Sequence, residues 1–102
     1  MSNILTSHIK FSSNTGYLDK QKALEFILEL EEIVWDILSG RQESLDKINE
    51  TNEAGKGSII LKFRVNRTFP TDELTELLDR FDLSCLGYYE NLEKDIIETI
   101  IM

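Results

Sequence analysis

Four basic residues occur without an intervening acid in the stretch NEAGKGSIILKFRVNR, residues 52–67: Lys56, Lys62, Arg64 and Arg67. Lysine and arginine side chains bind phosphates and carboxylates, so this stretch is a candidate anion site in which Lys62, Arg64 and Arg67 supply the charge. The same residues could instead neutralise the protein's own acids, or keep an exposed edge strand from pairing with another chain.

The glycines around Lys56 do not form a nucleotide-binding P-loop. That loop requires G-x-x-x-x-G-K-[ST] between a strand and a helix, so that backbone N–H groups and a helix N-terminus surround the phosphates. In AGKGS the lysine precedes the second glycine, and the segment that follows predicts a strand. We therefore interpret Gly55 and Gly57 as residues that let the chain turn before residue 58.

The second chemical feature is a series of carboxylates within a predicted helix over residues 18–39. Glu25, Glu29, Glu32 and Asp36 follow one another at i, i+4, i+7 and i+11, which places them on one stripe of that helix. Such a stripe is either a solvated face or a surface that meets a cationic protein partner and steers its approach.

Residues that could support catalysis or metal binding are few. His8 is the only histidine and Cys85 the only cysteine, and they lie far apart in the sequence. A lone cysteine is usually a small buried hydrophobe. No H-E-x-x-H, C-x-x-C or EF-hand spacing is present, so we predict neither a metal site nor a cofactor.

The composition indicates a single globular domain over residues 1–102. The chain is 41% hydrophobic and 29% charged, with a formal net charge of -8. Residues outside 52–67 include an even larger acidic excess, which disfavours nonspecific contact with nucleic acid or anionic membranes and favours basic partners. With one cysteine, no intrachain disulfide can form, and no apolar stretch at the N-terminus suggests a signal peptide. We therefore expect a cytoplasmic protein.

Apolar spacing over residues 18–39 predicts a long central helix that is buried on two sides and ends at Gly40. Trp35 shares an arc with Leu24, Leu28 and Leu38, which places it in the predicted core. Glu31 falls inside the apolar arc. It should therefore pair with a base such as Arg64 or Lys62, reach water at the helix end, or lie in an interface.

The remaining segments predict short elements around that helix. Alternating polarity indicates strands over residues 4–11 and 58–67, and LSCLGYY could be a third. A helix should begin at Thr71, because Leu74, Leu77, Leu78 and Phe81 follow at i, i+3, i+4 and i+7 spacing. Residues 41–57 could be a short helix or a mobile loop, and residues 90–102 a helix or a strand. The expected fold is a small two-layer α+β domain, with about three strands, a long central helix and two shorter helices.

Three functions remain open at this stage. The preferred hypothesis is a protein-binding module without catalysis, most concretely an immunity protein or inhibitor that neutralises a basic, nuclease-type toxin or enzyme. Its partner-binding residues would be Glu25, Glu29, Glu32 and Asp36. The alternative is an anion- or nucleotide-binding regulatory domain that uses the basic strand 58–67. An enzyme ranks third, because no catalytic set is evident.

Overall fold

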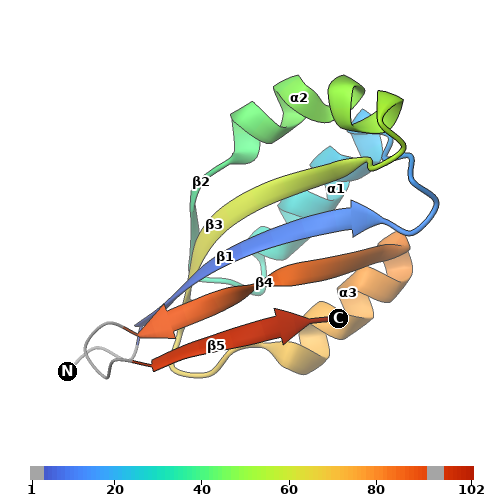
Figure 1. The fold of residues 1–102 in the computed structure, drawn as a ribbon. Coiled ribbons are helices and arrows are strands. Elements are labelled where there is room, and N and C mark those ends of the chain that lie inside the picture. Colours follow the sequence, from blue (N-terminus) through green and yellow to red (C-terminus); the bar gives the residue numbers. More distant parts are fainter. Residues whose placement is uncertain (1–3, 92–95) are drawn as a thin grey trace.

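The chain forms a five-stranded antiparallel sheet with helices on one face. The computed structural model describes residues 4–91 and 96–102. In chain order the elements are β1 (Ile4–Ser13), α1 (Lys20–Glu31), β2 (Asp36–Ser39), α2 (Arg41–Glu53), β3 (Ser58–Asn66), α3 (Thr71–Phe81), β4 (Leu83–Asn91) and β5 (Ile96–Ile101). The strand order is β2-β3-β1-β4-β5, so the first strand of the chain lies in the middle of the sheet (Figure 1).

Alternation along β1 assigns the two faces of the sheet. Leu5, Ser7, Ile9 and Phe11 are buried, whereas the intervening side chains reach the other face. β3 and β4 continue this division, because residues directly opposite one another in an antiparallel pair share a face. In the view of Figure 1, α1 and α3 lie behind the sheet and α2 lies along β3, so the described elements leave the opposite face of the sheet uncovered. We call it the open face.

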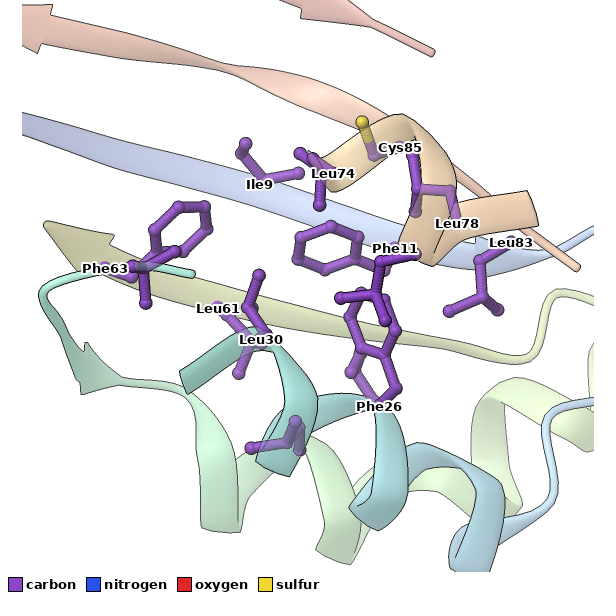
Figure 2. Close-up of a cluster of buried hydrophobic side chains, with 14 of the residues drawn as sticks. Ile9, Phe11, Phe26, Leu30, Leu61, Phe63, Leu74, Leu78, Leu83 and Cys85 are labelled. Carbon is purple, nitrogen blue, oxygen red and sulfur yellow. The ribbon is translucent and has the colours of Figure 1, made fainter. Parts of the chain in front are cut away.

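Phenylalanine side chains form the middle of the core. The ring of Phe11 lies 4.8 Å from that of Phe26 and 6.4 Å from that of Phe63, and Phe26 meets Phe81 edge-on at 5.6 Å. Aliphatic side chains from both layers surround these rings (Figure 2). The predicted apolar positions of α3, from Leu74 to Phe81, are all buried here, which confirms that helix.

The predicted central helix is wrong in its length and in its burial. α1 ends at Glu31, and Asp36–Ser39 forms the edge strand β2 instead. The chain leaves the helix through a tightened last turn, after which the backbone N–H of Trp35 donates to the carbonyl of Arg64 in β3 at 2.8 Å. The segment IVWDI is rich in β-branched and aromatic residues, which favour a strand when a sheet edge is available.

Trp35 is consequently not a core residue. It is 55% exposed, and Leu28 and Leu38 of the same predicted arc are exposed as well. Only one stripe of α1 is buried, formed by Ala23, Phe26, Ile27 and Leu30. Gly40 does not stop a helix either, since it follows β2 and precedes α2 with φ at 98°.

Two segments that the sequence left open are now assigned. Residues 41–53 form the helix α2, and the chain then turns through Gly55, at φ 71°, into β3. The C-terminal segment contains strand β5 rather than a helix over its described residues. Leu92 of the helical pattern lies outside the described residues. The α+β class is therefore confirmed, but about three strands understates a sheet of five.

The side chain of Ser44 on α2 replaces a neighbouring strand for part of β3. Strand β2 pairs only with residues 62–64, which leaves the backbone of Ile60 without a strand partner on that side. The Ser44 hydroxyl donates to the Ile60 carbonyl at 2.8 Å and accepts from the Ile60 N–H at 2.9 Å. One buried hydroxyl therefore satisfies both polar groups of that residue.

We expect Ser44→Ala to lower the free energy of unfolding by about 1–3 kcal/mol, because both backbone groups of Ile60 lose their partner. Urea denaturation would measure the change. The matched control is Ser39→Ala, at an exposed position of β2, which should change stability by less than about 0.5 kcal/mol. Equal effects of the two substitutions would contradict this role of Ser44.

Because Trp35 is 55% exposed, truncating its side chain should have only a small effect on stability. Trp35→Ala should cost much less than the roughly 3–5 kcal/mol typical of a buried aromatic residue, whereas Phe26→Ala should fall in that range. Thermal and urea unfolding of the two variants would compare them directly. A Trp35→Ala variant as unstable as Phe26→Ala would show that the ring is part of the core after all.

Candidate functional site

The open face carries a mixed apolar and polar surface. Register places Ile60, Leu86 and Ile101 in one row across β3, β4 and β5, with Lys10 of β1 between the first two. All three apolar side chains are more than half exposed, as is Ile97 on β5. This face therefore has apolar side chains in contact with solvent and little net charge.

The next row of the open face is polar and aromatic. The His8 ring stacks on Tyr88 of β4, with centroids 4.8 Å apart and an interplanar angle of 17°. His8 Nε2 also lies 3.4 Å from the Glu90 carboxylate, and Lys62 stands opposite His8 on β3. Cys85 is buried on the other face of the sheet, where burial raises the pKa of its thiol. His8 and Cys85 therefore cannot act as a catalytic pair.

Arg64 and Asp36 form a two-pronged ion pair across β3 and β2. Arg64 Nε donates to Asp36 Oδ1 at 2.9 Å, and Arg64 Nη2 donates to Asp36 Oδ2 at 2.6 Å. The guanidinium also lies over the indole of Trp35, 5.1 Å from the ring centroid. Hydrogen bonding from Arg64, reinforced by its charge, outweighs desolvation and lowers the pKa of Asp36 below its ordinary value.

The Arg64–Asp36 ion pair joins one residue of the predicted acidic site to one residue of the predicted anion site. Asp36 is on a strand and does not extend the acidic stripe of α1. Arg64 has its charge matched by Asp36, and Arg67 stands in the turn after β3 with φ at 70°. Of the predicted anion site, Lys62 and Arg64 share the open face of β3, whereas Arg67 lies just beyond the end of this strand.

The helix layer holds most of the negative charge of the protein. Helices α1, α2 and α3 contain five basic and eleven acidic residues, a net charge of -6, whereas the strands carry three bases and three acids. The sheet and the helix layer therefore present different electrostatic surfaces, one close to neutral and one strongly acidic.

Glu25, Glu29 and Glu32 remain together on the outer side of α1. Glu29 and Glu32 line a groove of about 220 Å³ between α1 and α3, together with Glu73 and Glu76 of α3. Ile33 and Leu77 contribute apolar surface to this groove, and Arg80 of α3 forms an ion pair with Glu29 at 2.9 Å. We define the acidic face as Glu25, Glu29, Glu32, Glu73 and Glu76.

An exposed leucine lies within the acidic face. Leu28 is 58% exposed. Glu25 precedes it by three residues and Glu32 follows it by four, so the helical repeat places these two carboxylates on the same side of α1. An exposed apolar side chain bordered by polar residues is common in protein interfaces.

Glu31, whose partner the sequence left open, forms an ion pair with Arg41 at the start of α2 rather than with Arg64 or Lys62. The pair lies between α1 and α2 and accounts for a carboxylate within the apolar arc. It does not contribute to the acidic face, so Glu31 is a structural residue in this arrangement.

Sequence reasoning missed the contribution of α3 to the acidic face. Glu73 and Glu76 are spaced i, i+3 opposite the buried positions of α3, so their exposure could have been inferred from the periodicity. Their proximity to Glu29 and Glu32 depends on the packing of α1 against α3, for which the sequence pattern contains no signal.

Comparisons with protein-family models, with curated proteins and with solved structures found no match. Among the described residues, no group of three or more histidine, cysteine, aspartate or glutamate side chains could hold a metal ion. No helix in residues 4–91 and 96–102 has the length and apolar character needed to cross a membrane. The argument for function therefore depends on the surfaces described above.

The Arg64–Asp36 pair predicts a pH-dependent difference between wild type and Asp36→Asn. Because the folded-state pKa of Asp36 is lowered, its contribution to stability is present above the unfolded carboxyl pKa and is lost as pH falls through the folded value. The unfolding midpoint of wild type should therefore exceed that of Asp36→Asn at pH 7, and the gap should close from about pH 4 downward.

Urea unfolding followed by fluorescence of Trp35, the only tryptophan, would measure this gap. The control is Asp79→Asn on the exposed side of α3, where no such pair with Arg64 exists. The gap should be small because both partners of the pair are more than a third exposed. A gap that persists unchanged at pH 2 would show that Asp36 acts through packing rather than charge.

Proposed function

We propose that this protein is a protein-binding module without catalysis, and that it binds a basic protein through the acidic face. The observation that supports this proposal is the separation of charge between the two layers, with the acids concentrated on the helices. The partner would place lysine and arginine side chains around the groove between α1 and α3, and an apolar pocket over Leu28.

The most concrete form of this function is an immunity protein or inhibitor of a nuclease-type toxin or enzyme. A protein that binds the nucleic-acid backbone needs a basic surface to neutralise phosphates. An inhibitor that covers such a surface benefits from the opposite charge, which accelerates encounter before the short-range contacts form. The small size of the chain and its net charge of -8 suit this role. The reducing cytoplasm is the proposed compartment, since the single cysteine allows no intrachain disulfide.

The alternative, an anion- or nucleotide-binding domain built on strand 58–67, has weaker support. Arg64 is already held by Asp36 in two hydrogen bonds, so an anion would have to compete with that carboxylate. Lys62 then remains the main free cation of β3 on the open face, with Lys10 on the neighbouring strand. Among the described residues, the five carboxylates of the acidic face form one ion pair, that of Glu29 with Arg80.

The experiment uses three immobilised baits: wild type, an acidic-face variant and a charge-matched control. The acidic-face variant carries Glu29→Gln, Glu32→Gln, Glu73→Gln and Glu76→Gln. The control carries Glu43→Gln, Asp46→Asn, Glu50→Gln and Glu53→Gln on α2, so both variants lose the same charge. A partner of the acidic face should be retained by wild type and by the control, and should be lost from the acidic-face variant.

Association kinetics with that partner would then test the mechanism. The wild-type association rate should fall as salt rises, because screening weakens long-range attraction. The acidic-face variant should associate about tenfold or more slowly at low salt, with a smaller dependence on salt, whereas the control should remain near wild type. Equal rates for the two variants would mean that only net charge matters, and would remove the assignment to this face.

A further inference from the structure

Strand β5 is an edge of the sheet, and three of its residues direct their backbone groups outward. Met102 exchanges both backbone hydrogen bonds with Cys85 of β4. In an antiparallel pair this pattern alternates, so every second residue of β5 faces β4 and the intervening residues face away. The outward N–H and C=O groups therefore belong to Ile97, Thr99 and Ile101, and in the described part of the chain β5 pairs only with β4.

This edge lacks the protection found at the other edge of the sheet. Strand β2 is short and its register is irregular. Beyond it, the Ser44 hydroxyl of α2 forms hydrogen bonds with the backbone of Ile60 in β3. β5 has the sequence IIETII, without lysine or proline, and its one charged residue, Glu98, accepts a hydrogen bond from the Tyr89 hydroxyl. Ile97 and Ile101 are 66% and 74% exposed. A regular apolar edge of this kind is a template for another strand.

We propose that two copies of this chain associate through β5, with the two strands antiparallel about a two-fold axis at Thr99. In this register Thr99 faces Thr99 of the second copy, and Ile97 faces Ile101. Each of these residue pairs would exchange both N–H···O bonds, because all of the residues involved have outward backbone groups. The two sheets would thus join into one.

The side chains favour this register over its neighbours. The pairing places Ile97 against Ile101 on the open face, and Glu98 against Ile100 on the helix side of the sheet. Sliding the second strand by two residues in one direction would again pair outward backbone groups, but it would place Glu98 opposite Glu98. Like charges directly opposite one another are unfavourable. A shift in the other direction leaves the backbone groups of Ile97 without a partner within strand β5 of the second copy.

The two-fold axis would be perpendicular to the sheet, so both helix layers would lie on the same side. The two acidic faces would then point in the same direction, available to partners. Because the contact consists of one short strand per copy, the dimer should form at micromolar rather than nanomolar concentration. Each copy carries a net charge of -8, so added salt should strengthen the dimer by screening repulsion.

Sedimentation velocity across a range of protein concentrations tests the proposal. Wild type should shift from monomer to dimer at micromolar concentration, and more readily at high salt. Thr99→Pro removes the central outward N–H without removing a bond to β4, and should weaken the dimer about tenfold or more. Thr99→Ala, which loses the same hydroxyl but keeps the N–H, is the matched control and should still dimerise. Circular dichroism checks that both variants are folded.

A charge-pair experiment tests the register and does not depend on the proline variant. Thr99→Lys and Thr99→Glu should each dimerise less than wild type, because like charges would meet at the two-fold axis. An equimolar mixture of the two should recover a heterodimer, since lysine then faces glutamate. Ile60→Lys, at an exposed isoleucine of β3 that is separated from β5 by two strands, should dimerise as wild type does.

Several results would overturn the proposal. A wild type that remains monomeric at hundreds of micromolar would exclude self-association, and the edge would then be open to a strand from a different protein. Loss of the dimer in Ile60→Lys with retention in Thr99→Pro would indicate that open faces stack instead. A dimer that survives in both Thr99→Lys and Thr99→Glu, with no gain on mixing, would exclude the two-fold register. None of these results bears on binding through the acidic face.

Discussion

The central position of β1 is the constraint on which the rest of the structure depends. This strand pairs with β3 on one side and with β4 on the other along most of its length, so its alternation is imposed on the whole sheet. Ile9 and Phe11 then define the buried face, against which all three helices place their apolar stripes. A slip of one residue in β1 would exchange the two faces, and His8 and Lys10 would enter the core.

Placing every helix on one face leaves the molecule with three kinds of surface. The helix layer is acidic, the open face is mixed apolar and polar with little net charge, and the β5 edge has backbone groups without a partner in the described part of the chain. The proposed partner site and the proposed dimer contact use different surfaces, so the two associations can coexist. Their salt dependences are opposite, because one is driven by attraction between unlike charges and the other is opposed by repulsion between like ones.

The spacing of apolar residues predicted correctly those elements for which it fits only a helix or only a strand. The strict alternation of β3 and the spacing of Leu74 to Phe81 each fit one structure only, and both predictions are confirmed. Residues 32–39 fit a helical wheel as well as a strand, and the choice depended on the free edge of β3, which a single-sequence pattern does not contain. The same limitation applied to β5, whose isoleucines fit either structure.

The candidate site was predictable only in part, for a related physical reason. Glu25, Glu29 and Glu32 remained together because their spacing is local to one helix. Asp36 left the group because its position depends on β2, and Glu73 and Glu76 joined it because α3 packs beside α1. Ion pairs such as Asp36 with Arg64 join residues far apart in the sequence, so their existence follows from topology and not from spacing.

The acids at the end of α1 are unfavourable for the helix itself, which is an argument that they serve another purpose. Glu29, Glu31 and Glu32 occupy its last turn and C-cap, where the helix dipole favours cations, and that turn contains no base. Arg80 and Arg41 offset two of these charges from neighbouring helices. A basic residue at position 32 would interact more favourably with the dipole of this helix. Residues that break a local rule without benefit to the fold are expected at functional surfaces, which favours recognition of a cationic partner here.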